Sequence, residues 1–169
     1  MAIIGELIKR VIDVGGIISK NPSPEGTQLE VLLKLLTKAK DTAFGRKFKF
    51  ADLLQQQDIT HAFQEAVPIY DYDTLYEHWW HYLEEGHENI TWPGGQRFFA
   101  LSSGTTSTSK AIPVTMDMLD SIKQAGIQQI LSLHEFDLPA DFFERDIMML
   151  GSSTNLRDWN GFLAGEISG

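Results

Sequence analysis

A run of eight residues, Ser102 to Ser109, contains seven hydroxyl side chains and one glycine, Gly104. Consecutive Ser, Thr and Gly residues expose backbone N–H groups with little steric bulk, and their hydroxyls add further hydrogen-bond donors. Lys110 follows directly, and it is the only lysine between Lys49 and Lys123. These groups together offer donors and one positive charge to a polyphosphate. The alternative is a flexible surface linker, because Ser/Thr-rich runs are also typical of spacers.

The segments on either side favour a binding loop over a linker. Arg97–Leu101 has the composition of a strand, and Ala111–Val114 is a second short extended segment. We therefore predict that the loop leaves a strand near residue 101 and is tied to a sheet at both ends. The glycine spacings of a Walker loop and of a dinucleotide fingerprint are absent, as is the Gly-x-Ser-x-Gly elbow of hydrolases.

Helical periodicity accounts for most of the remaining chain, and it places helices before and after the loop. The predicted helices cover residues 4–18, Pro24 to Ala43, a short stretch after Asp58, Asp71 or Asp73 to Gly86, and the segment after Thr115. Asp58 or Thr60 is expected near the start of the third, Asp71 or Asp73 caps the fourth and Thr115 the last. Gly15-Gly16 weakens the first helix, and Phe44-Gly45 stops the second. Asp146–Gly151 is predicted to be a second buried strand. Phe162–Gly169 shows no helix or strand pattern and resembles a chain that stops inside a domain, so we expect a fragment.

Composition and charge restrict the class of protein. The chain has 169 residues, of which 43% are hydrophobic, so it can form a packed core. It contains no cysteine and no apolar run near the ~20 residues that span a membrane, which predicts a soluble protein and is consistent with the cytoplasm. Residues 1–50 contain 9 Lys/Arg and 5 Asp/Glu, a net charge of +4, whereas residues 51–169 contain 5 and 18, a net charge of −13. So acidic a region repels nucleic acids, and we expect neither a nucleic-acid nor a membrane partner.

Several other side chains have two interpretations each. His78 and His81 share a helix face and suggest a metal site, although no third ligand has suitable spacing and a structural pair is favoured. Aromatic side chains at 79, 80 and 82 suit an acyl pocket but are more typical of a core. Arg97 is a partner for phosphate or for the acidic surface. The acids that could serve a metal, or simply be solvated, are Asp146, Asp158 and Glu166; the segments that could line an acyl site are Ser152-Ser153 and Asn155–Phe162.

The loop and its surroundings resemble a known family. Ser102-Ser103-Gly104-Thr105-Thr106 followed by Lys110–Thr115 is similar to the first signature of adenylate-forming enzymes. The order of further motifs resembles more narrowly the Gretchen-Hagen (auxin-responsive-promoter) family of acyl-acid amido synthetases. These motifs are Phe44-Gly45-Arg46, Val67-Pro68-Ile69, Asp71-Tyr72, Trp92-Pro93-Gly94, Phe98-Phe99-Ala100 and Asn160-Gly161-Phe162. The resemblance covers about residues 25 to 169.

The resemblance implies a ligase that uses ATP and Mg²⁺ to adenylate a small carboxylic acid and then transfers the acyl group to an amine or amino acid. It implies that Ser102, Ser103, Gly104, Thr105 and Thr106 line the phosphates and that Lys110 is the catalytic residue, and it names no metal ligand among these residues. It implies an α/β fold in which N-terminal helices pack on the first strands of a mixed sheet, within a larger domain. Residues 1–95 would form a mainly helical region, and residues 96–169 the start of the ATP-binding subdomain.

Two departures from the family pattern bear on activity. Ser107-Thr108-Ser109 lacks the second glycine that is common in the family's loop. The later family signatures lie beyond residue 169, so we expect the isolated chain not to complete the reaction. The competing interpretation is a non-catalytic nucleotide-binding or assembly module derived from an adenylate-forming enzyme. A reading frame that continues into a carboxylate motif favours the ligase, and a stop codon after Gly169 favours the module.

Overall fold

The computed structural model describes residues 3–18, 23–102, 110–146, 148 and 153–166 of the 169-residue chain. Backbone contacts divide the chain into two compact units. The first combines residues 1–22 with residues 116–151, and the second combines residues 23–115 with residues 152–169. The chain is mixed α/β, as predicted. The second unit carries the sheet and the two ends of the hydroxyl-rich loop.

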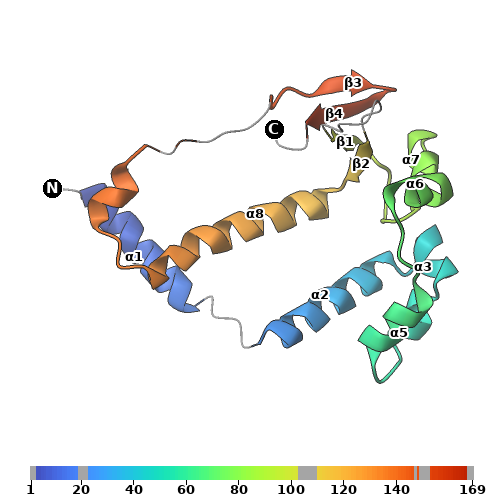
Figure 1. Ribbon diagram of the computed structural model, residues 1–169, viewed down its shortest axis with the longest axis horizontal. Coiled ribbons are helices and arrows are strands. Elements are labelled where there is room, and N and C mark those ends of the chain that lie inside the picture. The colour runs from blue at the N-terminus through green and yellow to red at the C-terminus, as the bar shows by residue number, and fades with distance from the viewer. Residues whose placement is uncertain (1–2, 19–22, 103–109, 147, 149–152, 167–169) are drawn as a thin grey trace. The chain divides into compact units, whose positions relative to one another are not determined.

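A four-stranded mixed sheet is the framework of the second unit (Figure 1). Its order is β2-β1-β4-β3, in which β1 pairs antiparallel with β2 and parallel with β4, and β3 pairs antiparallel with β4. The strands are β1 (Phe98–Leu101), β2 (Ala111–Val114), β3 (Arg157–Trp159) and β4 (Phe162–Glu166). The two strands predicted to flank the loop are therefore confirmed.

The prediction that the segment from Phe162 onward has no strand was wrong, because Phe162–Glu166 is an inner strand of the sheet. Asn160 and Gly161 join β3 to β4, and both have positive φ, 55° and 84°. Two positive-φ residues form the tight turn that matches the twist of a β-hairpin, and Asn-Gly is the sequence that adopts it most readily. The sequence signal was therefore present in the Asn-Gly pair.

A helical segment packs on this sheet. It consists of α6 (Tyr72–Leu75), the π-helical turn η1 (Tyr76–Trp80) and α7 (His81–Glu84). Asp71, one of the two residues from which this helix was predicted to start, caps it by accepting a hydrogen bond from the Thr74 N–H. Leu83 and Trp80 contact a buried cluster formed by Phe99, Leu101, Ala111 and Ala164. The segment is thereby fixed against β1, β2 and β4.

A second helical cluster in the same unit contains α2 (Pro24–Ala39), α3 (Ala43–Lys47), α4 (Phe50–Leu53) and α5 (Ile59–Ala66). Its buried side chains are Leu36, Ala39, Phe50 and Leu53. The predicted helix over Pro24–Ala43 ends earlier, at Ala39, because Thr42 caps a new helix. Phe44-Gly45 was predicted to be a stop but lies inside α3. The predicted helix after Asp58 is confirmed as α5.

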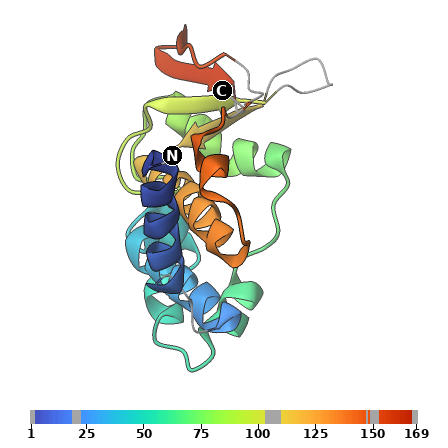
Figure 2. The ribbon, with the colours of Figure 1, turned by 90° about the vertical axis from the view of Figure 1, so that its left-hand side faces the viewer.

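The first unit is helical. Helix α1 (Ile3–Ile18) packs against α8 (Met116–Leu131) and the 3-10 turns η2 (Ser132–Glu135) and η3 (Ala140–Glu144) (Figure 2). The predicted weak point at Gly15-Gly16 does not interrupt α1, because Gly16 is buried against the His134 ring, where a side chain would not fit. Most of the strand predicted over Asp146–Gly151 lies outside the described residues.

Candidate functional site

The two ends of the hydroxyl-rich loop meet at the end of the β1–β2 pair. Leu101 is opposite Ala111 in the ladder, and the Ser102 N–H donates to the Lys110 carbonyl oxygen at 3.0 Å. Of the predicted site residues, Ser102 and Lys110 are thus brought face to face across the base of the loop. Ser103, Gly104, Thr105 and Thr106 lie outside the described residues. The loop therefore connects the two strands of a β-hairpin, and the sheet holds the loop at both ends.

The loop leaves β1 at the same edge of the sheet at which β4 ends. The two strands run parallel, and Leu101 is in register with Glu166. The carboxyl ends of parallel strands are the edge at which open α/β sheets bind ligands. Glu166, one of the three acids that the sequence suggested for a metal, is therefore beside Leu101, at the end of β1. Its Oε1 lies 3.8 Å from Nη2 of Arg157, a residue that no feature of the sequence marks by itself.

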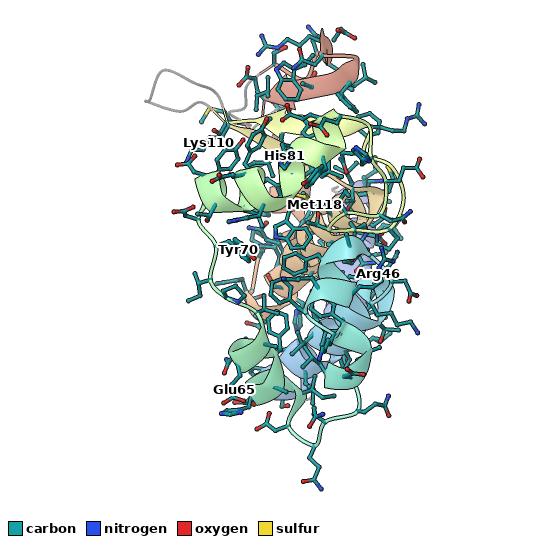
Figure 3. The ribbon with its side chains drawn as sticks, turned by 90° about the vertical axis from the view of Figure 1, so that its right-hand side faces the viewer. Arg46, Glu65, Tyr70, His81, Lys110 and Met118 are labelled. Atoms are coloured by element: carbon teal, nitrogen blue, oxygen red, sulfur yellow. The ribbon has the colours of Figure 1, made fainter. Side chains whose placement is uncertain are left out.

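Lys110 has a defined position at this edge (Figure 3). Its Nζ lies 4.7 Å from the centroid of the Tyr72 ring, above the aromatic face. A cation over an aromatic ring is attracted by the negative charge of the π face. The positive charge of Lys110 also helps to hold the pKa of Asp71 below its usual value, although the hydrogen bonds from Thr74 are the larger causes. The ammonium group therefore lies between a helix start and the base of the loop.

Tyr72 connects the helical segment to the edge strand as well as to Lys110. Its hydroxyl donates to the Ala111 carbonyl oxygen at 3.2 Å and accepts from the Ala111 N–H at 2.9 Å. Burial raises the pKa of the Tyr72 phenol, with Glu84 and Asp73 adding to the effect and the bond to Ala111 opposing it. The hydroxyl is thus protonated at neutral pH and able to donate. In the sequence, Asp71-Tyr72 stands out only as part of a family motif, because the contact joins residues 39 positions apart.

The remaining basic candidate and the histidine pair lie elsewhere. Arg97 precedes β1 and Ser102 follows it, so the two are five residues, or about 16 Å of strand, apart. His78 Nδ1 lies 2.8 Å from the Thr74 carbonyl oxygen, and His81 Nδ1 lies 3.1 Å from that of Tyr76. Among the described residues, no group of three or more His, Cys, Asp or Glu side chains could hold a metal ion. Each of these ring nitrogens thus lies beside a backbone carbonyl oxygen of its own helical segment.

The tryptophans of the helical segment take part in packing. The Trp79 ring lies 5.0 Å from that of Phe44 in an edge-on arrangement, and Trp80 contacts the sheet cluster. Tyr82 is 40% exposed and lies against the His81 ring. These contacts are those of a core and its margin.

In the part of the chain that the structure describes, no helix has the length and apolar character needed to cross a membrane.

Residues 17–169 match the GH3 family N-terminal domain, which is about nine-tenths of the chain. The chain belongs to the GH3 family. This confirms the family expected from the loop motif and its neighbours, and the GH3 match includes every residue of the candidate site. A comparison with curated proteins gives no match. The GH3 family comprises acyl-acid amido synthetases, so the chain is related to ligases.

Proposed function

We propose that this GH3 chain is the N-terminal part of an ATP-dependent ligase. The ligase adenylates a small carboxylic acid and transfers the acyl group to an amine or amino acid. Family membership supports the class of reaction. The single structural observation that carries the proposal is the pairing of Ser102 with Lys110 at the carboxyl end of β1, beside the end of the parallel strand β4. In this proposal, residues 96–169 begin the ATP-binding subdomain.

The proposed chemistry requires charge neutralisation more than a protein nucleophile. The carboxylate of the acid attacks the α-phosphorus of ATP, the bond to the β-phosphate oxygen breaks, and pyrophosphate leaves with the electron pair. The amine then displaces AMP from the acyl-adenylate. Negative charge develops on the departing pyrophosphate, and positioned donors stabilise it in proportion to how well they are fixed in advance. We assign this role to Lys110, and the binding of the phosphates to Ser102, Ser103, Gly104, Thr105 and Thr106.

Mg²⁺ fits this arrangement as an ion shared with the nucleotide. Mg²⁺ bound to ATP keeps several waters and needs only one or two carboxylates from the protein, so a cluster of three acids is not required. Glu166 is the carboxylate in register with Leu101, the last residue of β1. It would hold the ion, which when bound supplies neutralisation of phosphate charge. Its present partner, Arg157, is 63% exposed and lies at the outer margin of the ion-pair range, so the pair costs little to separate.

Calorimetry of MgATP binding tests the assignment of Lys110. Lys110→Ala removes a charged donor, and hydrogen bonds to charged groups are worth about 1.5–3 kcal/mol, so affinity is expected to fall about 10- to 100-fold. Lys123→Ala is the matched control, because Lys123 lies on α8, is 70% exposed and pairs with Asp120. Equal MgATP affinities in Lys110→Ala and the control would remove Lys110 from the site.

Pyrophosphate release tests the reaction itself. We expect the whole protein to release pyrophosphate from MgATP when the matching carboxylic acid in a panel is supplied, and Lys110→Ala to abolish this release. We expect the 169-residue chain to bind MgATP weakly and to release none, because the matched region is an N-terminal domain. Nucleotide binding by the whole protein without release for any acid would instead favour a non-catalytic nucleotide-binding module.

A further inference from the structure

We infer that Tyr72 is the positioning residue for Lys110. Its ring holds the ammonium group at the base of the loop, and its hydroxyl locks that ring to the edge strand. The inference rests on the proposed function, in which Lys110 meets the phosphates of ATP. It adds a residue outside the loop, in the helical segment that packs on the sheet.

The first support is the position of the ammonium group. Lys110 Nζ lies 4.7 Å from the centre of the Tyr72 ring, well within the range of about 6 Å in which a cation is attracted to an aromatic face. In the described part of the chain, no carboxylate lies within ion-pair distance of Lys110; Asp71 is near enough to feel its charge, and the Tyr72 ring is in direct contact with it. An aromatic face leaves the hydrogen-bond donors of the ammonium group unused. The group can therefore meet an anion without first breaking a salt bridge.

The second support is the double hydrogen bond between the Tyr72 hydroxyl and Ala111. β2 is an edge strand that pairs with β1 alone. Antiparallel pairs alternate between hydrogen-bonded and non-hydrogen-bonded pairs, and here Ser102–Lys110 is hydrogen-bonded. The next pair, Leu101–Ala111, is therefore not hydrogen-bonded. The N–H and C=O of Ala111 therefore point away from β1. Tyr72 satisfies both with one oxygen atom, at 2.9 Å and 3.2 Å. This fixes the ring next to the residue that follows Lys110.

The third support is the packing behind the ring. Tyr72 stacks on Tyr76 with the ring planes 19° apart and meets Trp80 edge-on at 5.9 Å. The π-helical turn that contains Tyr76 and Trp80 replaces regular α-helix here, and such turns are frequent at functional sites. Tyr76 is in turn held by the Glu84 carboxylate, to which its hydroxyl donates at 3.1 Å. The ring under Lys110 is thus supported from three sides.

A held lysine binds phosphate better than a free one. An unrestrained lysine side chain loses about 2 kcal/mol of rotamer entropy when it is ordered, and pre-ordering reduces the part lost on binding. The loss of the Tyr72 ring is expected to weaken phosphate binding about three-fold, which is the scale of an exposed cation–π contact. Because Lys110 contacts phosphate and Tyr72 does not, the effect of the Tyr72 change must disappear when Lys110 is absent.

NMR of protein labelled at lysine tests the contact directly. In the wild type, the ε-protons of Lys110, assigned by their loss in Lys110→Ala, are expected to shift upfield because they lie over a ring. Tyr72→Leu abolishes this shift, Tyr72→Phe reduces but retains it, and Tyr82→Leu, a change to an exposed tyrosine of the same segment, leaves it unchanged. A wild-type Lys110 without an upfield shift would overturn the inference even if every variant failed to fold.

Binding of inorganic triphosphate with Mg²⁺ tests the consequence. The expected affinity falls about three-fold in Tyr72→Leu, falls less in Tyr72→Phe, and does not change in Tyr82→Leu. In Lys110→Ala, the further change Tyr72→Leu has no effect. If Lys110→Ala weakens binding and Tyr72→Leu does not, the positioning role is wrong while the proposed function stands. If Lys110→Ala binds triphosphate as the wild type does, the proposed function fails at this site and the positioning role fails with it.

Discussion

Asp71 lies one residue before Tyr72, and the ionisation of its carboxylate affects how stability depends on pH. It accepts hydrogen bonds from the Thr74 hydroxyl and the Thr74 N–H, which hold the pKa of Asp71 below 3.8, with Lys110 contributing further. A group whose pKa is lower in the folded state adds stability above its unfolded pKa of about 4. That stability is lost as the pH falls through the folded value.

We therefore expect the wild type to lose more stability between about pH 5 and pH 2 than Asp71→Asn, whose amide also caps a helix but does not titrate. Urea unfolding at several pH values measures the difference. Asp141 is also held below its usual pKa, by the Arg145 side chain, so only the comparison with the variant isolates Asp71. Parallel stability curves for the two proteins would contradict this assignment.

Thr42 is 1% exposed and joins the end of α2 to the start of α3. Its hydroxyl accepts from the Gly45 N–H at 3.0 Å and donates to the Ala39 carbonyl oxygen at 2.7 Å. Thr42→Val keeps the shape but leaves the buried Gly45 N–H without an acceptor, so a loss of about 2 kcal/mol in unfolding free energy is expected. Thr42→Ser retains the hydroxyl and should lose less than about 1 kcal/mol. Equal losses in urea unfolding would show that the hydroxyl is not what matters.

At the scale of elements, α1 is held by close backbone contact. A side chain at Gly5 would collide with the Ala140 carbonyl group of η3, and the Gly5 N–H donates to Glu144 Oε1 at 2.8 Å. Gly5→Ala is therefore expected to cost about 2 kcal/mol, because the obstructing atoms are backbone. Gly126 in α8 meets no heavy atom within 4 Å in the described part of the chain, so Gly126→Ala should stabilise by about 0.5–1 kcal/mol. Thermal unfolding of the Gly5→Ala and Gly126→Ala variants measures both effects. Shifts of Tm in the same direction in the two variants would contradict the packing of α1 on η3.

The elements around the loop could be predicted because their signals are local. β1 and β2 follow from short apolar runs on either side of a polar loop, and the caps at Asp58 and Asp71 follow from residue type and position. The β3–β4 hairpin was missed although Asn160-Gly161 marked it, because β3 has only three residues and little alternation. Gly15-Gly16 was taken for a weak point because glycine lowers helix propensity, yet packing against residues 131 and 134 overrides that preference.

The site could be predicted in part for the same reason. Lys110 and Ser102 stand out by composition, but the partner of Lys110 does not. Tyr72 lies 38 positions earlier and reaches Lys110 because its hydroxyl is bonded to Ala111 of the edge strand β2. The sequence offered Glu166 and Asp158, together with Asp146, as acids for a metal without ranking them. The strand register distinguishes the first two: Glu166 is beside Leu101 of β1, whereas Asp158 is opposite Leu163 in the β3–β4 pair. Contacts set by strand order carry no signal in a single sequence.

At the scale of the whole molecule, charge distinguishes the proposed ligand from other polyanions. The net charge is −9, and residues 51–169, which include the loop, carry −13. Such a field disfavours a long polyanion, whereas one lysine with several neutral donors suits a single triphosphate. Duplex DNA at about 50 mM salt is expected not to compete with MgATP in calorimetry. Competition would show that the positive charges act as a general anion surface.

The two compact units differ in how much they bury, and this predicts the order in which the molecule opens. In the described part of the first unit, the buried residues are Ile12 and the glycines 5 and 16, whereas the second unit has two clusters of buried hydrophobic side chains. Segments with few buried apolar contacts open at lower free energy and as cooperative groups. Hydrogen exchange followed by mass spectrometry should therefore show α1 and α8, though separated by the 97 residues 19–115, losing protection together. Both should exchange before β1 and β4. Loss of protection in α1 alone, or first in the sheet, would contradict the division into two units.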